Sequence, residues 1–246
     1  MTTDLSWSPP PAAVDFTNDH QVDIWRIPLD LPMSSIKLLA KLLSTDETDR
    51  AARFYFPADQ NRYMISHGSL RNILAFYLHC EPSQLSFSIN TYGKPSLKDG
   101  QLEFNLSHSG DLALLAITRG RKIGVDVERM RAGISADILG GHYFSKAEMV
   151  ELQALPSEQR EGAFFLCWTR KEAYIKSQGM GLSLPLDSFD VSLTPGRPAL
   201  LRATRPDLGE AARWTLLSLS VGVGYEAAVA VEGHNLDFRL WDWRLS

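Results

Sequence analysis

Charged and aromatic side chains share one stripe of a helix predicted around residues 165–176. At 100° per residue, Phe165, Trp168, Glu172 and Lys176 fall on the same side. The two aromatic residues indicate that this side is buried, and a buried carboxylate or ammonium is costly unless its charge is compensated. Glu172 and Lys176 could pair with each other at i,i+4. The alternative is that they line a cleft, where Glu172 meets a metal ion or a proton and Lys176 meets an anion.

Two further carboxylates lie on one face of a strand predicted at residues 122–128. Apolar and polar residues alternate along this segment, so Asp126 and Glu128 project to the same side. At this spacing they can share one divalent cation, and hard oxygen ligands suit Mg²⁺, which often completes its shell with phosphate oxygens. A lone acidic pair is more often the solvent-facing edge of a strand. With Glu172 as a third carboxylate, the sequence favours a magnesium site.

The segment Tyr92-Gly93-Lys94-Pro95 is typical of a turn. Gly93 permits a positive φ, Pro95 restricts the chain, and Lys94 is displayed between them. Most turn lysines are only solvated, so this segment gains meaning as an anion site only beside other anion-binding groups.

Residues 104–110 end an alternating strand in a polar loop that presents Ser107 and His108. A Ser–His pair is also found in nucleophilic catalysis. Adjacent residues of a strand point to opposite sides, however, and the chain has no G-x-S-x-G nucleophile elbow. Hydroxyl, imidazole and turn amides are all hydrogen-bond donors, so the segment favours phosphate binding.

The order and spacing of these motifs resemble the 4′-phosphopantetheinyl transferases of the Sfp (surfactin-synthetase) type. The resemblance covers nearly the whole chain, and its first half, with Trp25–Pro28 and Arg53–Phe56, looks like the cyanobacterial branch. The segments that carry it are, in order, Gly93–Pro95, Asn105–Ser109, Gly124–Glu128, Phe144-Ser145, Trp168–Lys176 and Gly179–Phe189.

The resemblance implies a reaction and its participants. In this family coenzyme A is the donor substrate, and a serine of an apo carrier protein attacks its β-phosphorus, so that phosphopantetheine is transferred and 3′,5′-ADP leaves. The implied cofactor is Mg²⁺. The implied partners are apo acyl carrier proteins or the carrier domains of polyketide and nonribosomal peptide synthases. We further expect the protein to be a monomer.

The resemblance also assigns roles to residues. Asp126, Glu128 and Glu172 match the family's metal-site acids, and Glu172 is also the candidate base for the serine proton, directly or through water. Lys171 and Lys176 match lysines on the diphosphate, and Lys176 together with Glu172 is expected to carry the catalysis.

Further matches concern the ends of coenzyme A. His108 matches a phosphate-binding histidine, next to Ser107, and Arg50 falls on a basic position of the family. The predicted nucleotide-side loop is Tyr92, Gly93, Lys94 and Pro95. Glu47 and Met130 depart from the family pattern, so the resemblance does not assign the contacts of the 3′-phosphate.

The chain is also laid out twice. In each half an aromatic cluster precedes a long helix, and a proline-led segment and a pair of strands follow. This pattern predicts an α+β fold, a pseudo-dimer of two similar subdomains, each with a small antiparallel sheet packed on a long helix. We expect residues 1–120 to form the first and residues 121–246, with the metal site, to form the second. Residues 1–20 are predicted to be an extended lead-in.

Composition narrows the classes of partner. The 246 residues, 44% of them apolar, suffice for one large or two small packed units. A net charge of −4 gives no sign of affinity for nucleic acid or membranes. Cys80 and Cys167 lie in apolar helical patterns and form neither a disulfide framework nor a zinc motif. With no signal peptide and no long apolar run, the sequence predicts a cytoplasmic protein.

Two other classes of function remain possible from the residues. A Mg²⁺-dependent phosphodiesterase or nucleotidyl enzyme also uses paired acids and a lysine, and it would turn over without a carrier protein. A non-catalytic module that binds coenzyme A would need the anion site, but it gives no reason to keep three acids together with Lys176.

Overall fold

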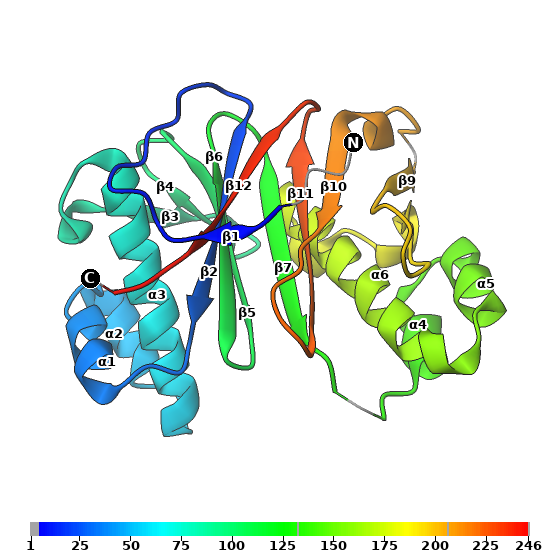
Figure 1. Ribbon diagram of the computed structural model, residues 1–246, viewed down its shortest axis with the longest axis horizontal. Helices are drawn as coiled ribbons and strands as arrows, with labels where there is room; N and C mark the ends of the chain where they lie inside the picture. Colours follow the sequence, from blue (N-terminus) through cyan, green and yellow to red (C-terminus); the bar gives the residue numbers. More distant parts are fainter. Residues whose placement is uncertain (1–4, 132, 206, 246) are drawn as a thin grey trace.

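Two long helices flank a pair of β-sheets, which lie between them (Figure 1). The computed structural model describes residues 5–131, 133–205 and 207–245. Helix α3 (Pro57–Leu78) packs on a five-stranded sheet, and helix α6 (Ser157–Gln178) packs on a three-stranded sheet. The larger sheet has the order β1 (Trp7–Ser8), β12 (Asp237–Asp242), β2 (Gln21–Pro28), β6 (Leu112–Thr118), β5 (Glu103–Ser109), and the smaller sheet has the order β10 (Trp214–Ser218), β11 (Tyr225–Glu232), β7 (Ile123–Arg129).

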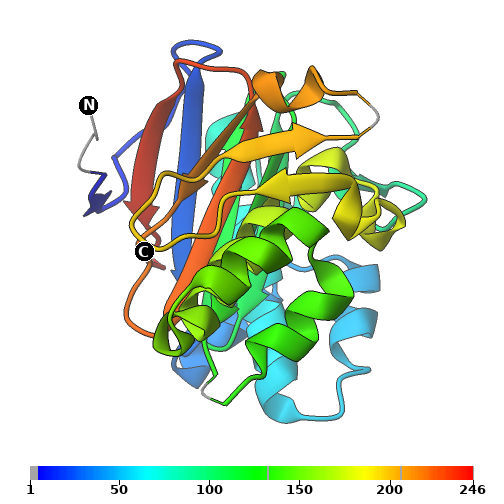
Figure 2. The ribbon, with the colours of Figure 1, turned by 90° about the vertical axis from the view of Figure 1, so that its right-hand side faces the viewer.

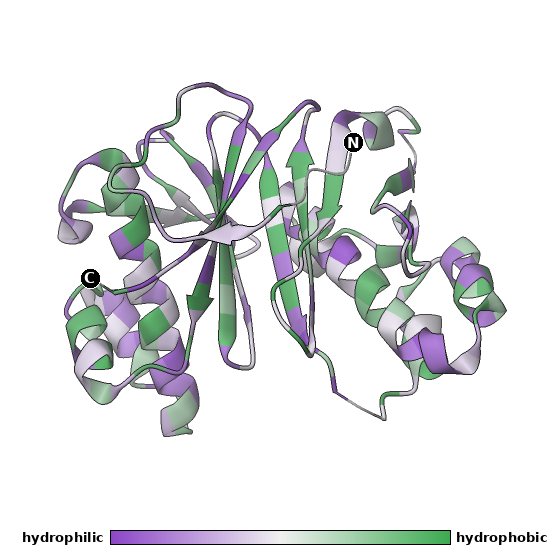
Figure 3. Cartoon of the chain, viewed as in Figure 1, coloured by the Kyte–Doolittle hydropathy of each residue, from purple (hydrophilic) through white to green (hydrophobic). Residues whose placement is uncertain are grey.

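Apolar side chains form three layers of core. One lies between α3 and the larger sheet, and a second lies between α6 and the smaller sheet. The third joins the two sheets and includes Ile24 and Leu114 of the larger sheet with Val125 and Val229 of the smaller one. Strand β6 is therefore buried on both faces, which explains its nearly unbroken apolar sequence. Figure 3 shows the same feature as green strands between the helices.

The two halves repeat one plan, as the sequence predicts. In each half a strand leads through two short helices to a 22-residue helix, and a short two-stranded ribbon and a hairpin follow. Strand orders β2-β6-β5 and β7-β11-β10 correspond. The predicted α+β pseudo-dimer is thus confirmed. The short helices are α1 (Met33–Ala40), α2 (Thr45–Ala51), α4 (Ala136–Tyr143) and α5 (Lys146–Ala154), and the ribbons are β3 (Phe87–Ile89) with β4 (Pro95–Leu97) and β8 (Phe189–Val191) with β9 (Leu201–Thr204).

The last strand of the chain belongs to the sheet of the first unit. Strand β12 pairs in parallel with β1 and β2, and Figure 2 shows it in red beside the blue β2. Arg239 donates two hydrogen bonds, each of 2.7 Å, to the buried carboxylate of Asp23 in β2. The predicted division after residue 120 does separate β6 from β7. Residues 237–242 nevertheless return to the sheet of the first unit and pair there in parallel, so the larger sheet is mixed rather than antiparallel.

An ion pair occurs at the same place in both units, and it is fully buried in the second. In the second unit, Glu148 completes the capping box of α5 and pairs with Lys171 of α6 at 2.8 Å, with both side chains at most 1% exposed. In the first unit, Glu47 completes the capping box of α2 and pairs with Arg71 of α3 at 2.6 Å. Each cation also donates to two backbone carbonyls in the segment after its long helix. Lys171 donates to those of Leu186 and Phe189, and Arg71 donates to those of Pro82 and Leu85. The pair therefore ties three segments of each unit together.

Both cysteines are free thiols, as the sequence predicts. Cys167 is buried in the core of the second unit, and Cys80 packs against the core of the first. Across the part of the chain that the structure describes, the helices lack the combination of length and apolar character needed to cross a bilayer.

Replacement of Lys171 tests whether its ion pair is structural. Lys171→Met keeps the aliphatic stem but leaves Glu148 buried without a cation, and breaking a buried pair in this way costs about 3–5 kcal/mol. We expect the free energy of unfolding, measured by urea denaturation, to fall by that amount. Lys171→Arg is the control, because it keeps the cation, and it should be clearly more stable than Lys171→Met. Equal stability of Lys171→Met and the wild type would show that the pair is not structural.

Candidate active site

The edge strands β5 and β7 of the two sheets are joined by side chains, and this contact is called the seam below. Three alternate residues of β5 accept hydrogen bonds from backbone N–H groups of β7, over distances of 2.8, 3.4 and 3.1 Å. The three acceptors, in order, are Asn105 Oδ1, Ser107 Oγ and Ser109 Oγ. The Asn-Leu-Ser-His-Ser motif therefore links the two units.

Asp126 lies at the centre of the seam and is only 2% exposed. Its Oδ1 accepts hydrogen bonds from Ser107 Oγ at 3.0 Å and from Lys176 Nζ at 2.6 Å. Lys176 Nζ also donates to Ser107 Oγ at 2.8 Å. One hydroxyl thus connects β5, β7 and α6 at a single point. The other oxygen of Asp126, Oδ2, is buried and has no hydrogen-bond partner.

Helix α6 reaches this point because Gly124 lets it approach β7 closely. A Cβ atom at Gly124 would lie 2.1 Å from the carbonyl oxygen of Ala173 and 2.3 Å from the backbone nitrogen of Ser177. Real side chains cannot tolerate such distances, so only glycine fits here. The strand alternation then puts Asp126 and Glu128 on the face that α6 covers.

Burial and nearby negative charge make Asp126 and Glu172 hard to ionise. The pKa of Glu172 is raised to about 7, mainly by burial and in part by the charges of Asp126 and Glu128, while Lys176 opposes the rise. Burial also raises the pKa of Asp126, although Lys176 counteracts this. Glu128 accepts a 2.8 Å hydrogen bond from Ser109 Oγ. A cluster of desolvated acids with one lysine is typical of a functional site.

The oxygens of the cluster are of the kind that a divalent metal ion prefers. Asp126 Oδ2 is a buried acceptor without a donor, and Glu128 and Glu172 add hard oxygen ligands of the kind that Mg²⁺ prefers. Among the described residues, no three histidine, cysteine, aspartate or glutamate side chains lie close enough to hold a metal as they stand. The Lys176 ammonium supplies the compensating charge on Asp126 in this arrangement.

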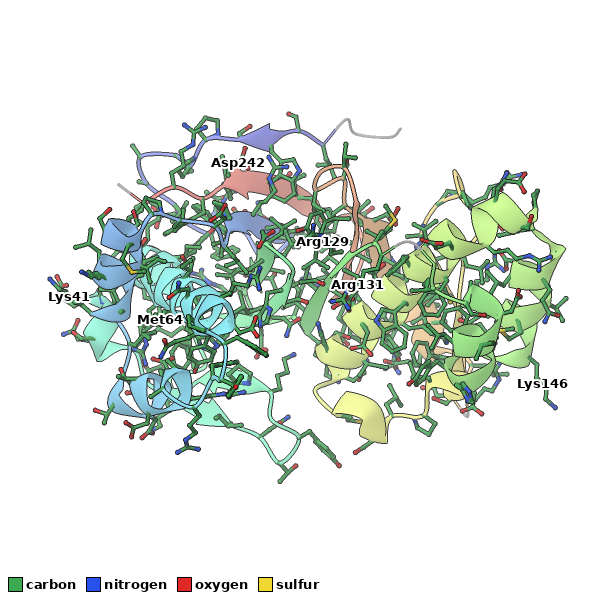
Figure 4. The ribbon with its side chains drawn as sticks, turned by 90° about the horizontal axis from the view of Figure 1, so that it is seen from below. Lys41, Met64, Arg129, Arg131, Lys146 and Asp242 are labelled. Atoms are coloured by element: carbon green, nitrogen blue, oxygen red, sulfur yellow. The ribbon has the colours of Figure 1, made fainter. Side chains whose placement is uncertain are left out.

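A cavity of about 540 Å³ lies at the end of the seam and is lined by both units. Arg62 and His108 face it from the first unit, and Arg129 and Arg131 face it from the second. Figure 4 shows Arg129 and Arg131 between the two units. Asp111 neutralises part of this charge, since it binds Arg62 at 2.8 Å and Arg129 at 3.5 Å. The net excess of cations suits an anionic ligand.

Two residues predicted to bind the ligand lie at or beside this cavity. His108 lines it, and the pKa of its ring is lowered by burial and then by the nearby His67 and Lys176. Arg50 lies in a neighbouring pocket, where its guanidinium stands 5.7 Å from the ring centre of Tyr63. The cavity and this pocket share Phe54.

The turn predicted at residues 92–95 is present, but its lysine has an unexpected environment. Gly93 has a φ of +90°, and its N–H bonds to the carbonyl of Asn90. Lys94 Nζ donates to the carbonyls of Ile123 at 3.1 Å and Ser177 at 3.3 Å, both in the second unit. Burial lowers the pKa of Lys94. Its ammonium therefore binds protein carbonyls rather than open solvent.

Lys171 does not join the cluster. Its side chain is fully buried on the side of α6 that faces α5, where it pairs with Glu148. This ion pair contradicts the predicted contact of Lys171 with the diphosphate. The helical spacing explains why Lys171 and Glu172 have different surroundings, because adjacent residues lie about 100° apart around the helix axis.

The internal repeat shows that the fold does not require this charge. In the first unit Asp23 of β2 bonds to Tyr77 of α3, and in the second unit Gly124 of β7 contacts Ser177 of α6. We align the two units on these contacts, so that β2 corresponds to β7 and α3 to α6. By this alignment, the counterparts of Asp126, Glu128, Glu172 and Lys176 are Trp25, Ile27, Asn72 and Phe76. Three of these counterparts, Trp25, Ile27 and Phe76, are apolar and belong to the core of the first unit. Packing of the same plan therefore does not need the charges found in the second unit.

Several site residues were not predicted. Ser109 and Asn105 belong to a motif noted in the sequence, but their contacts with β7 come from sheet packing. The arginines at positions 62, 129 and 131 carry no local motif, and only the tertiary structure brings them to one cavity.

Comparisons with known proteins identify the family of the chain. Residues 122–230 match the model of the 4′-phosphopantetheinyl transferase superfamily, and residues 32–119 match that of the N-terminal part of 4′-phosphopantetheinyl transferases. The 4′-phosphopantetheinyl transferase HetI of Nostoc sp. PCC 7120 is 40% identical over 242 residues, which cover 97% of this chain and 98% of that protein.

Two further relatives match a smaller part of the chain. A putative 4′-phosphopantetheinyl transferase of Synechocystis sp. PCC 6803, slr0495, is 33% identical over 80% of this chain and 79% of its own length. Sfp of Bacillus subtilis strain 168 is 34% identical over 69% of this chain and 76% of its own length. With both units matched and a relative aligned from end to end, the chain belongs to the 4′-phosphopantetheinyl transferase family, of the Sfp type and close to its cyanobacterial members.

Proposed function

We propose that this chain transfers the phosphopantetheine arm of coenzyme A to a serine of an apo carrier protein, and that the cluster at the seam performs the transfer. The observation that carries the proposal is the buried carboxylate of Asp126, with one oxygen on Lys176 and the other without a partner. Glu172 adds a carboxylate whose pKa is raised to about 7 by burial and by the charge of Asp126. Membership of the family favours this reaction over a carrier-independent phosphodiesterase and over a binding module without catalysis.

The reaction exchanges one bond to phosphorus for another. The serine Oγ bonds to the β-phosphorus of coenzyme A, and the bond from that phosphorus to the oxygen of the 3′,5′-ADP leaving group breaks. Glu172 takes the serine proton, directly or through water, since a carboxylate with a pKa near neutrality is well matched to this task. Lys176, one turn further along α6, stabilises the negative charge on the departing ADP.

Asp126, Glu128 and Glu172 would together hold Mg²⁺. When bound, this ion supplies positive charge to the diphosphate, whose reaction barrier is largely electrostatic. Ser107 and Ser109 donate to Asp126 and Glu128 and so fix the orientation of these carboxylates.

Coenzyme A is proposed to lie across the seam. The cavity with His108 and its arginines would take a phosphate of the nucleotide end, with Arg50 in the adjoining pocket. The loop Tyr92–Pro95 remains the proposed nucleotide-side loop, through its backbone and the half-exposed ring of Tyr92. Ligand sites commonly lie at such junctions between units.

The proposed partners are apo acyl carrier proteins or carrier domains of polyketide and nonribosomal peptide synthases. We propose that the protein acts as a monomer, because both halves of the site come from one chain. A cytoplasmic location accords with its two free thiols, Cys80 and Cys167, since reducing compartments keep thiols in that state.

Replacement of Glu172 tests the proposed base and metal ligand. Glu172→Gln should lower the transfer rate about 10²–10⁴-fold, because the amide accepts no proton at neutral pH. Glu128→Ala should lose less, because water can fill a vacated position around Mg²⁺. The measurement is the mass of an apo carrier protein incubated with coenzyme A and Mg²⁺, which gains one phosphopantetheine on transfer.

Glu158→Gln, at the exposed start of the same helix, is the matched control and should transfer at the wild-type rate. Near-normal transfer by folded Glu172→Gln would rule out the proposed role of Glu172. Consumption of coenzyme A by the wild type without a carrier protein would instead favour the phosphodiesterase.

The raised pKa of Glu172 predicts how stability depends on pH. The folded protein holds the proton up to a pH of about 7, whereas the unfolded chain releases it near 4.5. The stabilising effect of the protonated group is thus complete below pH 4.5 and is lost as the pH rises through about 7. In EDTA, the wild type should approach Glu172→Gln in stability at low pH and be less stable than it at pH 8.

The difference should reach at most about 3 kcal/mol, at 1.36 kcal/mol per pKa unit. It is measured by urea denaturation of both proteins at a series of pH values. Added Mg²⁺ should stabilise the wild type at pH 8 more than Glu172→Gln, because it binds only the folded state. Identical pH profiles for the two proteins would contradict the raised pKa.

A further inference from the structure

The hairpin between β3 and β4 in the first unit holds the end of α6 in the second. Asn90 Nδ2 donates to the carbonyl of Gly179 at 2.8 Å, and Lys94 Nζ donates to the carbonyl of Ser177 at 3.3 Å. The last carbonyls of a helix have no partner within the helix, and they form the negative end of its dipole. The hairpin therefore supplies donors, one of them charged, where α6 needs them.

The same hairpin also holds the start of β7, since Lys94 Nζ donates to the carbonyl of Ile123 at 3.1 Å. Ile123 precedes Asp126 by three residues, and Gly179 follows Lys176 by three. The hairpin is thus bonded to both elements that carry the Lys176–Asp126 pair, within one helical turn of Lys176. A shift of either element would change the 2.6 Å contact between these two side chains.

Asn90 organises this contact from both ends of its amide. Its Oδ1 accepts the N–H groups of Tyr92 and Lys94, each at 2.9 Å, which shapes the turn. Its Nδ2 reaches α6 at Gly179, whose left-handed φ of +67° ends the helix. A Cβ at Gly179 would stand only 3.2 Å from Asn90 Nδ2, so the hairpin and the helix end are closely packed.

We infer that Asn90 is a positioning residue for the transfer: through its bond to the end of α6 it sets the place of Lys176 relative to Asp126. The inference builds on the role proposed for Lys176 in the reaction. By the same inference, Lys94 joins the two units through its ammonium group, in addition to its proposed place in the nucleotide-side loop. Asn90 is the better residue to test, because Lys94 belongs to the loop proposed to bind the nucleotide.

Asn90→Asp separates the two functions of the side chain. The carboxylate still accepts the two N–H groups of the turn, but it sets an oxygen in place of the donor that faces the Gly179 carbonyl. We expect kcat to fall at least about tenfold, since small misplacements of catalytic groups have effects of this size or larger. The KM for coenzyme A should stay within about twofold, because the turn is kept.

A double-mutant cycle identifies the route of the effect. Transfer to an apo carrier protein is measured for the wild type, Asn90→Asp, Lys176→Ala and the double variant. If Asn90 acts through Lys176, Asn90→Asp should cost less than about twofold in kcat once Lys176 is removed. Ser88→Ala, in the same hairpin but bonded only to Ser96, is the control and should keep the wild-type kcat.

The outcomes distinguish this inference from the proposed function. A kcat of Asn90→Asp within twofold of the wild type overturns the inference and leaves the role of Lys176 intact. Equal losses with and without Lys176 show a general loss of structure and also overturn it. An unchanged kcat in Lys176→Ala refutes the role of Lys176 itself, and the inference fails with it.

Discussion

The site depends on the way in which β5 and β7 meet. In an ordinary sheet, backbone carbonyls of one strand accept the N–H groups of the next. At the seam, side chains of Asn105, Ser107 and Ser109 take that place. A serine hydroxyl that accepts a backbone N–H still has a proton to donate, and Ser107 and Ser109 give theirs to Asp126 and Glu128. The contact that joins the two units therefore also orients the acids of the site.

The internal repeat shows how one plan serves both stability and chemistry. Both units keep a capping box whose glutamate pairs with a cation of the long helix, Arg71 in one and Lys171 in the other. In the second unit, three acids and a lysine lie on the long helix and the first strand of its sheet, whereas the first unit has Asp23, bonded to Tyr77, between β2 and α3. The first unit fills the corresponding space with Trp25 and Phe76 and receives the C-terminal strand beside β2. One unit thus acts mainly as scaffold for the other.

Electrostatics explains why the cluster is confined to a single point. Burial raises the pKa of both Asp126 and Glu172, so each further acid placed there would ionise at a greater cost in stability. Lys176 offsets part of this cost through its 2.6 Å contact with Asp126. Lys176 stabilises the ionised form of Asp126 and is proposed to act in the reaction, so its position must be held rigidly. The hairpin bonds from Asn90 and Lys94 to the end of α6 provide that support.

Local spacing in the sequence predicted which side chains share a face of α6 or β7. The helical stripe placed Glu172 and Lys176 on one side of α6, and the alternation in β7 placed Asp126 and Glu128 on one face, because both periods are properties of the backbone. The repeated layout likewise predicted the two units. In contrast, the return of β12 was not predicted, because no pattern within residues 237–242 indicates which strand they pair with.

Tertiary structure alone decided which lysine serves which purpose. Lys171 and Lys176 lie on the same helix, but Lys171 meets Glu148 of α5, whereas Lys176 meets Asp126, fifty residues earlier in the chain. Lys94 is bonded to carbonyls 29 and 83 residues away rather than left open to solvent. The sequence determines the types and local periods of the side chains. Their partners depend on how distant segments pack, because hydrogen bonds and ion pairs form between atoms that the fold, not the spacing, brings within bonding distance.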